Sequence, residues 1–385
     1  MRRAVIIEAV RTPIGRAHPE KGWYRDVRAD DLSADIMKAL LERAKFPAGE
    51  VEDIHWGCVR QEGEQGFDVA RMAALIAGFP VEVGGATVNR NCGSSLQAIN
   101  QAAQSIAAEC EDVQIAGGVE HMHHFPFDLS YQPSPRYVYR HSPATLHMGL
   151  TAENLAIRYK ISRKQQDEFA LRSHRLAAEA TDTGMFADEV IATWGRDEEG
   201  RRILLTQDQC IRRDTSLESL AALKPAFMPE GGTVTAGNSS PLNVGAAATL
   251  VMSEERAKEL GLKPKARIKA MAVAGVDPSV MGIGPVPATH KALQRAGLKW
   301  EDIGLVEINE AFAAQTLAVI KHLGLDIEKV NVRGGAIAIG HPLGGSGARI
   351  ATTLIHAMLD RKVQFGLATM CIGAGQGIAT IFEAV

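Results

Sequence analysis

The sequence has few cysteines, and none of them is paired in a Cys-x-x-Cys motif. A chain of 385 residues contains five, widely spread: Cys58, Cys92, Cys110, Cys210 and Cys371. Isolated thiols at such spacing do not predict a zinc site or a redox motif, and an odd number fits a reducing compartment better than a disulfide framework.

Long apolar runs and a strong net charge are also absent. No apolar stretch reaches the roughly 20 residues that a membrane helix needs, and a net charge of −3 gives no general attraction to nucleic acid. The opening "MRRAVIIEAVRTPIGR" predicts a first strand, because Glu8 interrupts the apolar run and no small-residue cleavage site follows. The closing "IFEAV" is not a peroxisomal Ser-Lys-Leu signal. We expect a cytoplasmic protein.

The chain carries two pairs of similar segments, which predict a duplicated half. Residues 38–59 resemble residues 291–311, because each has an apolar helix, the triplet Glu-Asp-Ile and then a strand. Residues 92–120 parallel residues 343–371, where a glycine/serine turn opens a helix that leads into a strand. Repeats this far apart indicate duplicated half-domains rather than a solenoid. Alternating helices and buried strands place the fold in the α/β class.

The region between the two halves keeps neither pattern. It contains a proline- and aromatic-rich loop followed by helices such as "SRKQQDEFALRSHRLAAEAT". Long structured loops in compact proteins are usually functional. We therefore divide the chain into an N-terminal half at 1–118, an inserted loop domain at 119–248 that covers an active site, and a C-terminal half at 249–385.

Cys92 opens a helical pattern in "NCGSSLQAINQAAQSIAAEC". The positive end of a helix dipole stabilises a thiolate, so the position favours a nucleophile, although a buried packing thiol is the alternative. Three more glycine-rich stretches each offer one reactive side chain: "EINEAFAA" has Asn309 or Glu310, "GGAIAIGHPLGGSGAR" has His341, and "MCIGAGQG" has Cys371. Because ligands bind at the carboxyl ends of strands in open α/β sheets, duplication brings all four together.

These motifs, in this order, resemble the thiolase family over essentially the whole chain. The stretches "WGCVRQEGEQGFDVAR" and "GGVEHM" resemble most the 3-ketoacyl-CoA thiolase subunit of bacterial fatty-acid oxidation complexes. The resemblance implies two βαβαβαββ halves that form a five-layer α-β-α-β-α core, with an inserted loop domain that binds coenzyme A. It also implies thiolytic cleavage of 3-ketoacyl-CoA to acetyl-CoA and a shortened acyl-CoA.

The resemblance assigns a role to each motif residue. Cys92 is the nucleophile that carries the acyl group, His341 takes its proton, and Cys371 protonates the departing enolate and later deprotonates CoA. His341 and a water on Asn309 form one oxyanion hole, while the backbone N–H groups of Cys92 and Gly373 form a second. Glu310 is interpreted as an anchor for its loop.

Coenzyme A is expected as a co-substrate, with no permanently bound cofactor and no metal. The matching positions for CoA lie mostly in the loop domain: Met148, Arg212, Ser219, Leu223, Phe227 and Ser240. His121, His123 and His124 in "EHMHHF" resemble a metal motif, but no cysteine or carboxylate at supporting spacing accompanies them.

Two features depart from the family pattern. Val244 occupies the position before the glycine in "NVGAAA" where many thiolases have aspartate. The 125–145 loop, which includes "SYQPSPRYVYRHSP", holds Tyr131, Tyr137 and Tyr139 and differs from the subunits of bacterial complexes. The acyl chain length and the docking of partners depend on such loops.

Two other functions remain open at this point. A short-chain acetoacetyl-CoA thiolase, or acetyl-CoA acetyltransferase, has the same catalytic motifs, and a non-catalytic CoA-ester carrier or scaffold subunit is a remote alternative. The resemblance further implies a homodimer or homotetramer, and a hydratase/dehydrogenase subunit of a β-oxidation complex as a partner. We expect 3-ketoacyl-CoA, CoA and acetyl-CoA as ligands.

Overall fold

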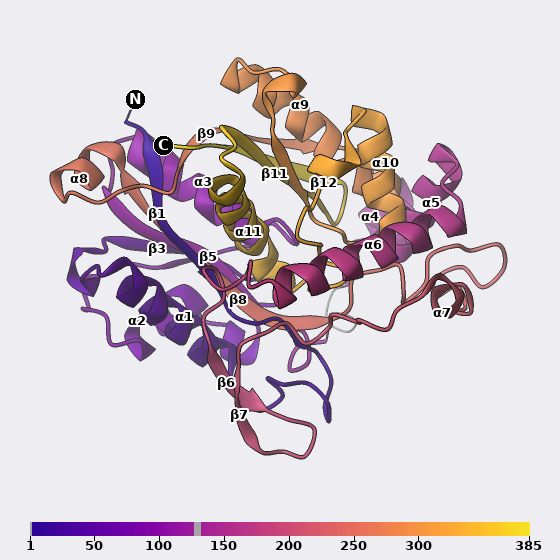
Figure 1. Ribbon diagram of the computed structural model, residues 1–385, viewed down its shortest axis with the longest axis horizontal. Coiled ribbons are helices and arrows are strands. Elements are labelled where there is room, and N and C mark those ends of the chain that lie inside the picture. Colours follow the sequence, from indigo (N-terminus) through magenta and orange to yellow (C-terminus); the bar gives the residue numbers. More distant parts are fainter. Residues whose placement is uncertain (1, 127–131) are drawn as a thin grey trace.

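The computed structural model describes residues 2–126 and 132–385, and most strands of this region join in one mixed sheet (Figure 1). Ten strands hydrogen-bond in the order β10-β11-β12-β9-β1-β8-β5-β3-β4, with β2 attached to β8. The strands of the N-terminal part are β1 Ala4–Arg11, β2 Gly15–Arg16, β3 Asp53–Gly57, β4 Ala86–Val88, β5 Val113–His121 and β8 Asn243–Ser253. Those of the C-terminal part are β9 Ala266–Gly275, β10 Leu305–Ile308, β11 Phe365–Ile372 and β12 Gln376–Glu383.

The two parts of the sheet meet at a short seam between β1 and β9. Only Val5 with Arg267 and Ile6 with Ala266 pair across it, whereas β1 pairs with β8 from Ala4 to Arg11. Each part is therefore nearly a sheet of its own. Strands β5 and β8 are buried along their whole length, as expected for strands that are covered on both faces.

Two helices lie between the two parts of the sheet. Both α3 (Ser94–Ala107) and α11 (Ser346–Arg361) contribute to one core cluster that also contains side chains of β1, β5, β8, β9, β11 and β12. Residues 346–358 of α11 are all buried. Since these helices contact strands of both parts, they form the middle layer of the molecule.

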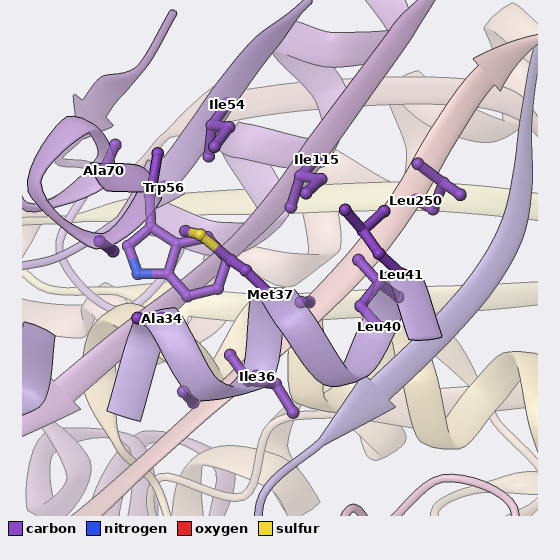
Figure 2. Close-up of a cluster of buried hydrophobic side chains, with 14 of the residues drawn as sticks. Ala34, Ile36, Met37, Leu40, Leu41, Ile54, Trp56, Ala70, Ile115 and Leu250 are labelled. Carbon is purple, nitrogen blue, oxygen red and sulfur yellow. The ribbon is translucent and has the colours of Figure 1, made fainter. Parts of the chain in front are cut away.

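An outer helical layer covers the N-terminal part of the sheet. Helix α1 (Ala29–Ala44) has apolar residues at helical spacing, and Figure 2 shows Met37, Leu40 and Leu41 turned towards the strands. They lie in the same cluster as Trp56 of β3, whose indole N–H donates to Ser33 Oγ at 3.1 Å. Helix α2 (Val69–Ile76) completes this layer.

The second outer layer consists of α9 (Pro285–Ala296) and α10 (Ala313–Leu323) on the C-terminal part. The order of layers is therefore helices, sheet, helices, sheet, helices, and the predicted five-layer α/β fold is confirmed. The two sheets of that prediction are joined at the seam of β1 and β9.

The predicted duplication corresponds to equivalent elements. In the first segment pair, α1 leads to β3 and α9 leads to β10; in the second, α3 leads to β5 and α11 leads to β11. Strands β3 and β5 are parallel neighbours, and so are β10 and β11. The same helix–strand units therefore pair in the same way in both halves.

The inserted region connects β5 to β8, so it runs from residue 122 to residue 242. Within its described part lie the hairpin of β6 (Thr193–Arg196) with β7 (Arg202–Leu205), and the helices α4 (Pro135–Arg140), α5 (Met148–Tyr159), α6 (Arg163–Asp182) and α7 (Leu217–Ala221). Buried Arg11 of β1 joins the inserted region to the sheet, because it donates to Glu189 at 2.6 Å and to Asp208 at 2.7 Å. Helix α8 (Glu254–Glu259) follows β8. None of the helices in residues 2–126 and 132–385 is long and apolar enough to cross a membrane.

Candidate active site

Cys92 lies in a tight turn two residues before α3 begins. Asn91 has a left-handed φ of 45°, and Gly93 is the N-cap of the helix. A Cβ on Gly93 would come within 2.6 Å of Ile372, so the close approach of this turn to β11 requires glycine. The cysteine is thus at the N-terminal end of α3, but not in its first turn as the sequence predicted.

The resting state of Cys92 is a thiol. Burial raises its pKa to about 11, and the backbone N–H groups of Gly373 and Cys92 itself lower it only in part. The stabilisation of a thiolate that the helix terminus offers is outweighed here by desolvation, which raises the pKa of the thiol. Any reaction through the Cys92 thiolate therefore needs a base to remove the proton.

Cys371 lies near Cys92, towards the end of β11. It is 1% exposed and packs in a small cluster with Met281 and Ala311, against which Met148 also lies. Burial raises the pKa of Cys371 far above its usual range, and the nearby Cys92 raises it further. Two neutral thiols therefore lie close together, one from each half of the duplicated fold.

Gly373 follows β11 and links the two cysteine segments. Asn91 Nδ2 donates to its carbonyl at 3.3 Å, and its N–H points to the Cys92 thiol, whose pKa it lowers. A Cβ at Gly373 would come 3.4 Å from Met148 Sδ. That distance is an ordinary van der Waals contact, and Gly373 is not among the residues with a left-handed backbone.

His341 is held in one tautomer. Its Nδ1 lies 2.6 Å from Ser346 Oγ, and the hydroxyl of Ser346 itself donates to the carbonyl of Pro342 at 2.8 Å. Because that hydroxyl hydrogen is used, Nδ1 must carry a proton and donate it. The lone pair of Nε2 then faces Asn309, whose Nδ2 lies 3.3 Å away. Burial lowers the pKa of His341 to about 3, and the nearby Arg349 lowers it further, so the imidazole is neutral.

Asn309 comes directly after β10, and its backbone N–H donates to Thr369 of β11 at 3.1 Å. Its side-chain Oδ1 is buried and has no hydrogen-bond partner among the described residues. The neighbouring Glu310 accepts hydrogen bonds from Ser173, Asn331 and the backbone of Ile337. Glu310 therefore anchors the loop before His341, as it was interpreted, while Asn309 keeps an acceptor free.

Two family profiles cover nearly the whole chain. The thiolase N-terminal domain matches residues 4–255, and the thiolase C-terminal domain matches residues 262–384. The chain belongs to the thiolase family. The resemblance drawn from "NCGSS", "NEAF", "GHP" and "CIGAGQG" is thereby confirmed.

Relatives that match the chain over its full length show which members of the family it resembles. The chain is 58% identical to a 3-ketoacyl-CoA thiolase of Pectobacterium carotovorum and 56% identical to one of Shewanella loihica, with 100% of each chain covered. Among solved structures, it resembles human mitochondrial 3-ketoacyl-CoA thiolase (TM-score 0.92, 40% identity) and a Bacillus anthracis acetyl-CoA acetyltransferase (TM-score 0.90, 43% identity). Each likeness covers 100% of this chain and 99% of the solved one.

Three of the residues predicted to contact CoA in this thiolase lie next to the catalytic segments. Met148 begins α5 beside Gly373 and Cys371. Phe227 is 41% exposed and meets the ring of Phe312 edge-on at 5.9 Å. Ser240 donates from its N–H and Oγ to the carbonyl of Ala311. These contacts place the apolar side chains around the loop that follows Asn309.

The other three predicted CoA residues lie between Met148 and Phe227 in the sequence. Leu223 is partly buried against the core of the C-terminal half, and Ser219 is exposed, with its Oγ bound to Ser216 at the start of α7. Arg212 is exposed and lines a small cavity with Arg16 and His174. Their contacts do not join them to the two cysteines.

The histidine cluster has a carboxylate partner that sequence spacing missed. Glu64, His121 and His124 bring their ligand atoms within 4.8 Å of one another. However, His121 bonds the carbonyl of Tyr24 and the N–H of His124, while His124 bonds Glu64 and the carbonyl of Arg25. All four ring nitrogens thus have protein partners, which tie residues 121–124 to the N-terminal segment.

Three supporting residues were not predicted as part of the site. Ser346 fixes the His341 tautomer, and Asn243 Oδ1 accepts from the His341 N–H at 2.8 Å. Buried Glu120 accepts from the N–H groups of Val59, Arg60 and Gly344. The position of Ser346 at the start of a helix, five residues after His341, was visible in the sequence; the long-range partners of Asn243 and Glu120 were not.

Of the two departures from the family pattern, the structure describes Val244 and part of the 125–145 loop. Val244 is buried in the outer core and pairs with His121 of β5, so the polar role at this end of β8 belongs to its neighbour Asn243. Tyr131 lies outside the described residues. Tyr139 is 91% exposed in α4, and Tyr137 bonds Thr145.

Proposed function

We propose that the chain catalyses thiolytic cleavage of 3-ketoacyl-CoA by coenzyme A, giving acetyl-CoA and an acyl-CoA two carbons shorter. The observation that carries this proposal is the approach of two neutral thiols, partly exposed Cys92 and buried Cys371, in a fold that also pairs Asn309 with a neutral His341. Relatives at 54–58% identity over their full length bear the name of this activity and support it. Membership of the thiolase family makes the chain an acyltransferase.

In the first step, Cys92 Sγ attacks the 3-keto carbon while His341 Nε2 takes the thiol proton. Since the pKa of Cys92 is raised to about 11 and that of His341 is lowered to about 3, the proton moves as the bond forms and not before. The backbone N–H groups of Cys92 and Gly373 are placed to donate to the oxygen of this tetrahedral adduct. Preorganised donors of this kind contribute about 2.7–4 kcal/mol each.

In the second step, the bond between C2 and C3 breaks and acetyl-CoA leaves as an enolate. Cys371 donates its proton to C2 and becomes a thiolate. The protonated Nε2 of His341 and the amide of Asn309 stabilise the negative charge on the enolate oxygen. The shortened acyl group remains on Cys92 as a thioester.

Coenzyme A completes the cycle. Its thiol gives a proton to the Cys371 thiolate and then attacks the acyl carbon on Cys92. When Cys92 sulfur leaves, it regains the proton that His341 held, so both cysteines end as thiols. For CoA contacts we propose Met148, Leu223, Phe227 and Ser240 at the pantetheine and Arg212 and Ser219 further out, in keeping with a largely apolar site that has few polar anchors.

The cellular setting follows from this activity. We propose a cytoplasmic enzyme of fatty-acid β-oxidation that forms a homodimer or homotetramer, since closed symmetric assembly is the default for such enzymes. A hydratase/dehydrogenase subunit is the proposed hetero-partner, because it makes the 3-ketoacyl-CoA substrate. We propose residues 119–248 as the loop domain of the three-part division; this range contains the inserted region together with the adjoining ends of β5 and β8.

A second candidate is acetyl-CoA acetyltransferase, which the 43% identity to the Bacillus anthracis enzyme favours. Substrate length separates the two. We expect kcat/KM for thiolysis of a 3-ketoacyl-CoA series from C4 to C16 to stay high beyond C4, as loss of the enolate absorbance reports. Activity confined to acetoacetyl-CoA would favour the acetyltransferase instead, and no thiolysis at any length would reject both.

A further inference from the structure

Helix α11 carries a buried cation behind the candidate active site. Arg349 lies in the first turn of the helix and is 0% exposed, and none of its three guanidinium nitrogens has a hydrogen-bond partner among the described residues. Removing a charge from water is expensive unless it is paired and hydrogen-bonded. A cation that a fold keeps in this condition requires an explanation.

Arg349 and His341 belong to the same local structure. His341 Nδ1 donates to Ser346, the first residue of α11, and Arg349 follows one turn later. On the facing strand β10, side chains alternate, so that Leu305 belongs to the middle core cluster while Val306 and Ile308 belong to the outer one. Glu307 and Asn309 therefore both face α11.

The two elements form two successive contacts. Asn309 Nδ2 lies 3.3 Å from His341 Nε2, and Glu307 Oε2 lies 3.9 Å from Arg349 Nη1. Glu307 precedes Asn309 by two residues, so the contact of Glu307 with Arg349 is the next one along the chain from the contact of Asn309 with His341. Glu307 is 2% exposed, and its Oε2 has no hydrogen bond among the described residues.

The other charges around Arg349 are committed to partners of their own. Glu310 from the loop after β10 is bound by Ser173 and Asn331, and Glu189 of the inserted region is bound by Arg11 of β1. Arg333 lies 3.6 Å from Glu189 and also interacts with Glu307. Of these groups, only Arg349 has a resolved electrostatic influence on His341.

We propose that Arg349, backed by Glu307, is a positioning residue that keeps His341 a neutral, weakly basic imidazole and returns its proton to sulfur. This inference rests on the proposed role of His341 as the base. When His341 takes the Cys92 proton, the new imidazolium lies in the field of a like charge that water does not screen. The imidazolium persists only while negative charge on the substrate offsets that repulsion, and it gives up its proton once the Cys92 thiolate leaves.

The electrostatics of the resting site agree with this geometry. Burial is the larger cause that lowers the pKa of His341 to about 3, and Arg349 is the next. Burial also raises the pKa of Glu307 to about 8 in spite of the cation beside it. Burying Glu307 and Arg349 therefore costs folding free energy. A cost that the fold retains is a reason to test whether the pair has a functional role.

The test is Arg349→Gln, with Arg361→Gln as a matched control. Arg361 ends the same helix but is exposed and far along the chain from His341. Protein labelled with ¹³C-histidine is titrated by NMR, with His341→Asn to assign the signal, and kcat/KM is measured against pH. Loss of the like charge should raise the pKa of His341 by about one to three units, so that an acid limb appears in kcat/KM for Arg349→Gln and not for Arg361→Gln.

If Arg349→Gln does not fold, the double variant with Glu307→Gln also replaces the facing carboxyl group and should shift the pKa of His341 in the same direction. A His341 signal that titrates as in wild type in the folded variant overturns the inference, whatever the activity. A shifted signal without any acid limb keeps the electrostatic link but removes His341 as the base, which overturns the proposed role of His341 instead. A shift in both measurements supports the inference.

Discussion

Single residues in the site carry protonation states that the sequence alone could not give. The start of a helix was expected to stabilise the Cys92 thiolate, but burial raises the pKa of the Cys92 thiol to about 11. His341 was expected to be able to act as a neutral imidazole, and the contacts of Ser346 supply the tautomer that this requires. Residue types and order indicate which groups react, whereas desolvation depends on packing between distant segments.

The protonation of Cys92 gives a direct prediction for alkylation. Below a pKa of about 11 the thiolate fraction rises about tenfold for each pH unit, so iodoacetamide should label the Cys92 peptide roughly 100-fold faster at pH 9 than at pH 7. Peptide mass spectrometry at short times measures this rate. A rate that does not change over this range would show that the thiolate already exists at pH 7.

At the scale of elements, the N-terminus of α11 holds the ring of His341, the proposed base. Ser346 is buried at the first helical position and accepts from His341 Nδ1. Replacing Ser346 with alanine leaves that N–H unsatisfied, which costs about 1–3 kcal/mol. We expect kcat/KM to fall about five- to 100-fold, with the same CoA-ester affinity by calorimetry.

An unchanged kcat/KM for Ser346→Ala would contradict this assignment of the tautomer. Thermal unfolding of the variant controls for a general loss of structure, since Ser346 lies in the middle layer. A control for the loss of a serine hydroxyl at a helix start is Ser162→Ala, because exposed Ser162 caps α6 and is not among the residues proposed for the site.

Much of the element pattern was predictable from the sequence, for physical reasons that particular segments illustrate. The similarity of residues 38–59 to 291–311 predicted the units of α1 with β3 and α9 with β10, because local periodicity and turn residues determine such units. The partners of the histidine cluster were not predictable. Glu64 reaches His124 from 60 positions away, and only the tertiary fold brings that carboxylate to the ring.

For the whole molecule, the duplicated fold explains why the site needs both halves. Cys92 comes from the turn before α3 in the first repeat, and Cys371 comes from the end of β11 in the second. His341 and Asn309 also come from the second half, and Met148 and Phe227 come from the inserted region. Neither half alone contains the proposed nucleophile, the proposed base and the second thiol, so the proposed chemistry depends on the five-layer arrangement.

The transfer of a shortened acyl group to Cys92 is the step that most directly tests this function. The protein is mixed with 3-ketohexadecanoyl-CoA in the absence of free CoA, quenched in acid and digested, and the mass of each cysteine peptide is measured. We predict a C14 acyl group on the Cys92 peptide, acetyl-CoA released in equal amount, and no such adduct in Cys92→Ser. An adduct on another cysteine, an uncleaved C16 group, or acetyl-CoA released without any acylated Cys92 would contradict the mechanism.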